Sequence, residues 1–157
     1  MKPNPTPEQN RSHVNIILKK ALFCHLGMSI NDMPYVVTVN FGYDDKYIYF
    51  HSNQKGKKVE MIASNPNVCF ELNYGGEVFS NQQSCNWGTK YRSVIGYGKA
   101  ELLKSDANKK KGLLAIMYKY SSSKEHEFNE HVLAHTNVYR INRKNTNAKN
   151  NHWYWTD

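Results

Sequence analysis

The sequence predicts a mainly β fold of the α+β class, an antiparallel barrel with helices at its periphery. Runs rich in β-branched and aromatic residues recur along the chain and are separated by turn residues, which is typical of antiparallel strands. Two glycines inside one long strand-like run, Gly96 and Gly98, indicate a bend where a barrel strand turns a corner. Other stretches carry apolar residues at helical spacing and predict the peripheral helices.

The first part of the chain predicts a helix and two strands. Residues 1–10 hold three prolines among polar residues, and we expect a flexible arm. Ser12 is a suitable N-cap for a short helix, because apolar residues follow it at helical spacing. A strand over 23–30 then turns at Asn31 and Asp32, and Met33-Pro34 open the next strand.

The stretch from Tyr35 to Pro66 is the most informative part of the sequence. A strand over 35–41, a turn over 42–46 and a strand over 47–52 predict a hairpin. A helix then begins near Gly56, beside three lysines at positions 55, 57 and 58, and stops before Pro66. Exposed N–H groups, the positive end of the helix dipole and ammonium groups together favour a bound phosphate. The hairpin is therefore predicted to lead into a phosphate site.

The second half of the chain predicts alternating strands and helices around one long loop. The expected elements are a strand over 67–73, a polar loop over 75–85, a strand over 91–103, a helix over 105–120, a short helix near 128–133, a strand over 136–142 and a polar tail over 143–157. The loop is long enough to predict mobility or a ligand.

Length and composition predict one domain, over residues 1–157, with a modest core. The three cysteines form no C-x-x-C pair, so we expect reduced thiols and neither a disulfide framework nor a zinc ribbon. No run of about 20 apolar residues and no hydrophobic signal core occurs in the sequence, which favours a soluble, cytoplasmic protein away from membranes.

The chain is basic, with a formal net charge of +8 and a pI near 9.3. Nucleic acid, acidic lipid and phosphorylated ligands are all suitable anionic partners, and charge does not choose among them. A small basic β-barrel that binds nucleic acid is therefore one hypothesis, because stacking tyrosines would suit single strands.

Motifs of other enzyme classes are missing from the sequence. His126 and Glu127 are followed by His131, but a zinc-protease helix needs its histidines four residues apart, so no metal site is predicted. The chain has no Gly-x-Ser-x-Gly, no Walker loop and no dinucleotide glycine motif, which argues against hydrolases and kinases.

An ordered set of short motifs carries a family resemblance. The motifs are Cys24-His25-Leu26-Gly27, the segment Pro34 to Asp45, IYFHS at 48–52, Gly56-Lys57-Lys58, Asn65-Pro66, VCFEL at 68–72 and Tyr91 to Gly98. In this order they resemble the flavin-binding split β-barrel superfamily typified by pyridoxamine 5′-phosphate oxidase, and more closely the 5-nitroimidazole resistance (Nim) proteins. The resemblance runs from about His13 to Tyr139. It implies a Greek-key-like split barrel and a homodimer with a flavin, FMN or alternatively FAD, between the subunits.

The resemblance also assigns positions. The implied cofactor-binding residues are Tyr35, Val36, Val37, Thr38, Val39, Asn40, Phe50, His51, Ser52, Lys57, Lys58 and Ser93. His51 is in addition the candidate proton donor, because an imidazole titrates near neutrality. Trp87, Tyr91 and Arg92 are candidates for stacking on or orienting a flat substrate. Lys57 stands where the family has an arginine, which replaces a bidentate fork by a point charge.

The resemblance implies a flavin-dependent reductase that converts a nitroimidazole to its amine, with the flavin supplying hydride. The chain lacks a counterpart of the Arg-Leu-His-Asp-Arg segment with which pyridoxamine phosphate oxidase binds its substrate, so vitamin B6 synthesis is not expected. Two alternatives stay open: the nucleic-acid-binding barrel, and a flavin carrier or sensor without turnover.

Overall fold

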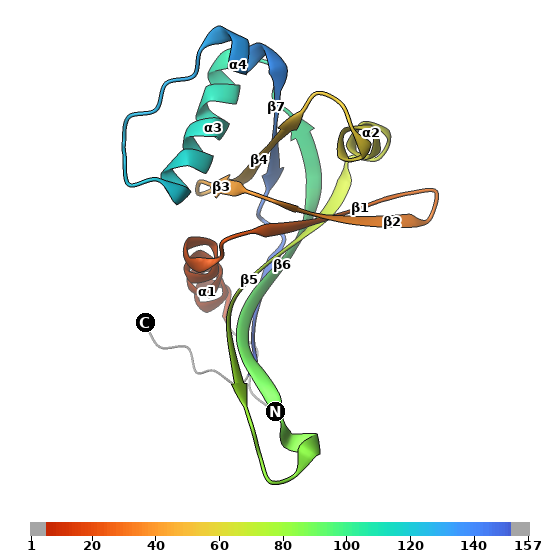
Figure 1. The fold of residues 1–157 in the computed structure, drawn as a ribbon, viewed down its shortest axis with the longest axis vertical. Coiled ribbons are helices and arrows are strands. Elements are labelled where there is room, and N and C mark those ends of the chain that lie inside the picture. Colours follow the sequence, from red (N-terminus) through yellow and green to blue (C-terminus); the bar gives the residue numbers. More distant parts are fainter. Residues whose placement is uncertain (1–5, 152–157) are drawn as a thin grey trace.

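A computed structural model describes residues 6–151 (Figure 1). The helices are α1 (Pro7–Lys20), α2 (Lys57–Ser64), the short 3₁₀ helix η1 (Ser84–Asn86), α3 (Asp106–Tyr120) and α4 (Glu130–His135). The strands are β1 (Cys24–Ile30), β2 (Met33–Val39), β3 (Phe41–Tyr43), β4 (Tyr47–Asn53), β5 (Asn67–Phe79), β6 (Gly88–Leu102), β7 (Thr136–Asn142) and β8 (Thr146–Asn151).

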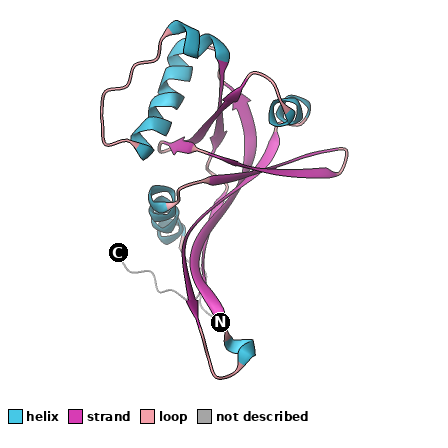
Figure 2. Cartoon of the chain, viewed as in Figure 1, coloured by secondary structure: helices cyan, strands magenta, loops and turns pink. Residues whose placement is uncertain are grey.

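Within the described residues the strands form one antiparallel, eight-stranded sheet in the order β2-β1-β5-β6-β7-β4-β3, with β8 beside β6. The two ends of this order, β2 and β3, are consecutive in the chain and are joined by Asn40. The sheet curls on itself into a half-barrel, and the helices lie outside it (Figure 2). This arrangement confirms the predicted fold class, a split β-barrel with peripheral helices. The opening of the barrel, between β2 and the end of β4, is called the split below.

Two apolar clusters lie on opposite faces of the sheet. The larger cluster fills the barrel, where Leu26, Phe50 and Phe70 are at most 1% exposed. The second cluster, around Tyr49 and Leu113, packs α3 and α4 against the outer face of β4 and β7. Burial of such side chains is the main stabilising term of the fold.

Gly42 allows α3 to pack directly on β3. A Cβ at this position would lie 2.2 Å from the carbonyl carbon of Ala115, so any larger residue would push the helix away. The close approach explains why the short strand β3 makes extensive contacts with α3.

Asp44 holds the turn between β3 and β4. Its Oδ1 accepts the backbone N–H groups of Lys46 and Tyr47, and its Oδ2 accepts the Tyr49 hydroxyl at 2.8 Å and lies 3.0 Å from Lys111 Nζ. Burial alone would raise the pKa of Asp44, but these hydrogen bonds outweigh it and lower the pKa to about 2. The turn therefore depends on an ionised carboxylate.

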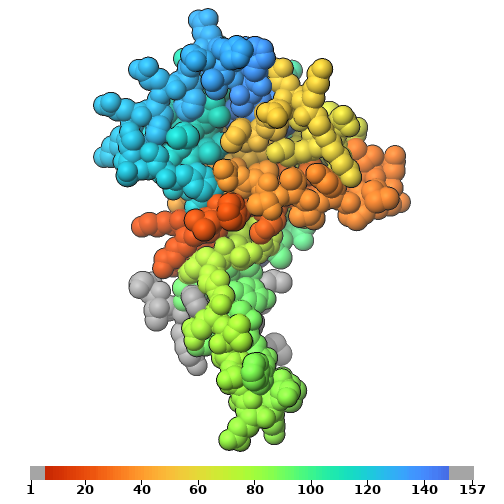
Figure 3. Space-filling view, in the orientation of Figure 1, coloured from red at the N-terminus to blue at the C-terminus, as the bar shows by residue number. Residues whose placement is uncertain are grey.

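The β5–β6 hairpin is the longest element of the molecule. Its distal part, around η1, projects from the body as a narrow arm (Figures 1 and 3). Val78 and Trp87 are exposed on this arm, and the Trp87 indole donates to the carbonyl of Asn81 at 2.8 Å. A two-stranded ribbon is marginally stable alone, so the arm is the part of the molecule that would gain most stability from packing against another surface.

The helix α1 begins earlier than predicted. Ser12 lies inside it, and Thr6 is its N-cap, in a capping box with Gln9 and with Pro7 at the first helical position. The expected arm over residues 1–10 was therefore wrong for 7–10, because the capping box outweighs the apparent flexibility of a proline-rich start. Residues 1–5 lie outside the described part of the chain.

The hairpin predicted from 35–41 and 47–52 was paired incorrectly. β2 pairs with β1 along its whole length, and the separate strand β3 pairs with β4. The change of partner occurs at Asn40, and the N–H of Phe41 donates to the hydroxyl of Tyr120 on α3. A β-rich run looks continuous in sequence although its hydrogen bonds pass to a different neighbour.

The predicted loop over 75–85 and the polar tail over 143–157 both contain strands. β5 continues to Phe79, because the ladder accommodates Gly75 and Gly76 as an irregularity at positive φ. Residues 146–151 form β8 on the edge of β6. Residues 152–157 lie outside the described part of the chain.

Candidate functional site

The helix α2 begins at the split. Gly56 is its N-cap, with φ at 124°, and no side chain caps the first N–H groups. A conformation with positive φ favours glycine, so the sequence Gly-Lys-Lys turns sharply into the helix. At the other end Asn65 anchors α2 to β1, since its amide donates to the Ser29 carbonyl at 2.9 Å. The N–H groups at the start of α2 are thus oriented and available to an anion.

Lys57 and Lys58 reach opposite walls of the split. Lys57 Nζ lies 4.4 Å from the ring centroid of Tyr35 on β2. Lys58 Nζ lies 5.8 Å from the ring centroid of Phe50 and 3.4 Å from the carbonyl oxygen of His51, both on β4. Burial lowers the pKa of Lys58. An anion between the two walls would offset this desolvation of the ammonium group.

The β4 wall of the split is built from aromatic and polar side chains. The rings of Phe50 and Tyr139 stack at 5.0 Å, and the Tyr139 hydroxyl accepts from Asn137 at 3.4 Å. Ser52 is buried beside them and donates to the carbonyl of Asn53. Tyr139 and Asn137 were missed in the sequence, because only their pairing with β4 brings β7 to the split.

His51 lies on the outer face of β4. Burial and the nearby charge of Lys58 lower its pKa, so the neutral imidazole is favoured near neutrality. A neutral imidazole is a weaker proton source than an imidazolium, but it still offers one N–H. The role of His51 as proton donor stays a prediction.

The predicted residues of β2 divide between two faces. Tyr35, Val37 and Val39 face the barrel core. Val36 and Thr38 are exposed on the outer face of the sheet, where Val36 has 65% of its surface accessible. β2 therefore offers a ligand one free backbone edge together with the side chains of its outer face.

A groove of about 590 Å³ runs across this outer face beside the split. Its residues come from β1, β2, β5, β6 and the link before β8, and they are Gly27, Met28, Ser29, Pro34, Tyr35, Val36, Asn67, Val68, Cys69, Tyr97, Gly98, Lys99 and Asn145. A Cβ on Gly27 would lie 2.6 Å from Cys69 Sγ, so the glycine keeps the groove floor open. The groove is mainly apolar with few polar groups, which suits a flat aromatic ligand.

The predicted substrate residues are not brought together. One row across the sheet is formed by Val36, Gly27, Cys69 and Tyr97. Trp87 directly precedes β6 and is ten residues from Tyr97, which at 3.3 Å per residue is roughly 33 Å from that row. Within one chain, Trp87 is therefore out of reach of a ligand held at Lys57 and Lys58.

Tyr91 and Arg92 lie on opposite faces of β6. Tyr91 is 41% exposed, whereas Arg92 is 5% exposed and donates to the Tyr74 hydroxyl at 2.6 Å. Ser93 is buried opposite Asn73 in the β5–β6 ladder. The binding roles of these three residues stay predictions.

Two outward-facing residues that the sequence analysis missed lie beside the groove. His25 Nδ1 is 3.0 Å from Glu71 Oε2, and the amide of Asn73 donates to both carboxylate oxygens of Glu71 at 3.0 Å. The sequence contained a signal for these two residues, because each is a polar residue between two buried ones in an otherwise apolar strand. The buried residues are Cys24 and Leu26 in β1 and Phe70 and Leu72 in β5.

Neither a metal-ligand cluster nor a membrane-spanning helix occurs within residues 6–151. No group of three or more His, Cys, Asp or Glu side chains in that part of the chain could hold a metal ion. Similarly, none of the helices described there is both long and apolar enough to cross a bilayer.

Residues 10–150 match the family model of pyridoxamine 5′-phosphate oxidase. The chain belongs to this family. No curated protein matches the sequence significantly. The superfamily inferred from the short motifs is thereby confirmed.

Solved structures similar to this chain include flavoproteins. A candidate 5-nitroimidazole antibiotic resistance protein from Bacteroides thetaiotaomicron is 26% identical, with a TM-score of 0.78 over 87% of this chain and 81% of that chain. The flavocytochrome Anf3 from Azotobacter vinelandii is 19% identical, with a TM-score of 0.80 over 93% and 69% of the two chains. An FAD- and heme-binding protein from Mycobacterium smegmatis is 14% identical, with a TM-score of 0.79 over 94% and 74%. The last two show likeness of fold alone.

Proposed function

We propose that this protein is a flavin-dependent reductase that holds FMN at the split and reduces a nitro group or another small flat substrate. The observation that carries the proposal is the placement of Lys57 and Lys58 at an uncapped helix start, against the two walls of the split. A phosphate accepted by these N–H groups would lie between both ammonium groups. FAD offers phosphate charge of the same kind and is the alternative form of the cofactor.

The chain's own residues would bind and orient the cofactor. The free edge and outer face of β2 offer a surface for the flat ring system, and the mainly apolar groove beside it offers one for a flat substrate. His51 would offer an N–H beside the split, and Ser93 a hydroxyl on β6. When bound, the flavin supplies hydride chemistry, and the protein contributes orientation and exclusion of water.

A homodimer would complete the site. Val36 and Tyr97 are 65% and 61% exposed on the outer face of the sheet, and a second copy would cover them. The projecting arm carries Trp87 too far from its own split, so in a dimer Trp87 and Tyr91 would serve the partner's flavin site. A flavin between the subunits is the arrangement that the family resemblance implies.

The proposed substrate class is nitroaromatic. It is supported by the Nim-like motifs and by the 26% identical structure of a candidate 5-nitroimidazole resistance protein. Full reduction of a nitro group to an amine consumes six electrons, which three hydrides would deliver. A flavin carrier or sensor would bind the same cofactor and stop there.

Titration of the purified protein with FMN tests the proposal. We expect quenching of flavin fluorescence with micromolar or tighter affinity. Anaerobic mixing of the reduced holoprotein with a 5-nitroimidazole should then reoxidise the flavin and yield an amine. Flavin uptake with unchanged drug would leave the carrier or sensor function, whereas no uptake would refute flavin binding and favour the nucleic-acid-binding alternative.

A further inference from the structure

His25, Glu71 and Asn73 form a connected polar group at the centre of the outer sheet face. His25 and Glu71 are directly opposite each other in the β1–β5 ladder, and Nδ1 is 3.0 Å from Oε2. Asn73, two residues along β5, holds both carboxylate oxygens at 3.0 Å. The side chains of His25 and Glu71 are 40% and 32% exposed, so the group is open to a ligand.

A structural role alone explains little of this arrangement. Opposite charges across a sheet contribute only about 0.2 to 1 kcal/mol, and exposed pairs are at the lower end. A carboxylate that holds one imidazole nitrogen, however, fixes the ring and directs the other nitrogen away from it. The third partner, Asn73, restricts the carboxylate in turn. Such an arrangement orients a proton donor.

This polar group of His25, Glu71 and Asn73 lies at the end of the groove, where the edge of a bound ligand would be. His25 is paired with Thr38 on β2, and Asn73 is paired with Ser93 on β6, so residues implied to contact the flavin lie on both sides of it. The groove row that contains Gly27 is two residues along β1, about 7 Å away. A flat ligand seated in the groove would therefore bring its edge to His25.

We propose that His25 is a catalytic proton donor to a nitro substrate bound in the groove, and that Glu71 is its positioning residue. The inference rests on the proposed reductase function and assigns its proton source. When bound and reduced, the flavin would supply the hydride of the first two-electron step. The imidazolium form of His25, with its Nδ1–H held by Glu71, would supply one proton from Nε2, so that the nitro group becomes a nitroso group and one water leaves. The imidazole is then reprotonated from solvent.

The titratable surroundings of His25 are simple. On this face β5 presents Glu71 and Cys69, and β2 presents the uncharged Thr38. The strand β6 presents Tyr91, Tyr97 and Lys99, and the last two line the groove. His51 lies on β4, in a different part of the sheet. A change in the pH dependence of turnover on substitution of His25 is therefore attributable to the His25–Glu71 pair.

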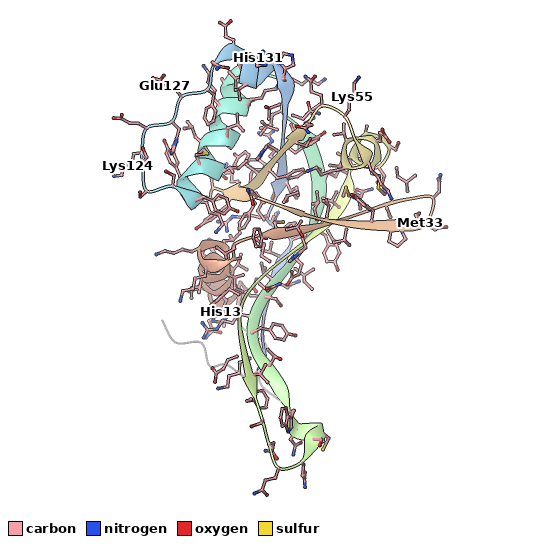
Figure 4. All side chains as sticks on the ribbon, viewed as in Figure 1. His13, Met33, Lys55, Lys124, Glu127 and His131 are labelled. Carbon is pink, nitrogen blue, oxygen red and sulfur yellow. The ribbon has the colours of Figure 1, made fainter. Side chains whose placement is uncertain are left out.

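The test compares the wild-type holoprotein with His25→Gln, Glu71→Gln and the surface control His131→Gln, which lies on α4 (Figure 4). FMN affinity is measured first, and we expect all three variants to bind within about threefold of the wild type. Reoxidation of the reduced holoprotein by a 5-nitroimidazole should then slow by ~100- to 10,000-fold in His25→Gln, as for loss of a general acid. Glu71→Gln should slow it about tenfold and displace the pH profile, and His131→Gln should change neither.

A second readout does not depend on turnover. Nitroimidazole added to the oxidised holoprotein should shift the imidazole ¹⁵N resonances of His25 and leave those of His131 in place. Wild-type rates and pH profile in His25→Gln, or His25 resonances that do not move, would overturn the inference while the flavin function stands. Failure of the wild type to bind FMN would instead refute the proposed function.

Discussion

Replacement of Lys58 by alanine is the sharpest test of the phosphate site. The Lys58 ammonium lies at the split, 3.4 Å from the His51 carbonyl, and its pKa is lowered by burial. A half-buried ammonium that meets a phosphate makes a charge-assisted contact worth about 1.5 to 3 kcal/mol. At about 1.4 kcal/mol per factor of ten, Lys58→Ala should weaken FMN binding by roughly 10- to 100-fold.

Fluorescence titration with two ligands separates this effect from general damage. Riboflavin lacks the phosphate, so its affinity should be nearly unchanged in Lys58→Ala. Lys57→Ala should weaken FMN binding in the same direction, because Lys57 faces the other wall of the split. Lys55→Ala is the matched control, since Lys55 lies on the link before α2 (Figure 4). If all three folded variants bind FMN like the wild type, the phosphate lies elsewhere and the reasoning fails.

Three further predictions concern the fold and the assembly. Asp44→Asn should lower the free energy of unfolding, measured with urea at pH 7, by about 2 kcal/mol. The pKa of Asp44 is about 2 in the folded protein and 3.8 ordinarily, so this contribution is complete above pH 3.8 and is lost as the pH falls towards 2. At pH 2 the variant and the wild type should be equally stable. Gly42→Ala should lower the free energy of unfolding by about 3 kcal/mol, because its Cβ would overlap Ala115, and an unchanged thermal midpoint would contradict this packing. Val36→Glu should convert the proposed homodimer into a monomer in light scattering, and a dimer mass in the variant would place the interface on another face.

The sequence predicted the elements of the fold better than their partners. Alternation and turn residues located the β1–β2 hairpin, β4, β6 and β7, since these signals are local. The break at Asn40 was missed because the sequence on either side is equally β-rich, and the partner of Phe41 is a hydroxyl 79 residues away. Pairing between distant strands is decided by packing, which no local pattern records.

The candidate site was likewise predicted where the sequence pattern is local and missed where it depends on strand pairing. Gly56, Lys57 and Lys58 were predicted from a local pattern, and the structure brings both lysines to one opening. The grouping of Tyr91 with Arg92 depended on proximity in sequence, but neighbours in a strand point to opposite faces. His25 and Glu71 were missed because they are 46 residues apart and meet only through the register of β1 and β5.

The split also has a consequence for solubility. β2 ends the strand order on one side, so its outer edge presents backbone donors and acceptors that a foreign strand could adopt. The exposed Val36 makes that edge more prone to pair with another strand, whereas the lysines at the start of α2 repel other copies of this basic chain. A ligand bound along β2 would occupy the same edge. The proposed flavin would therefore also shield the strand that is most prone to aggregate.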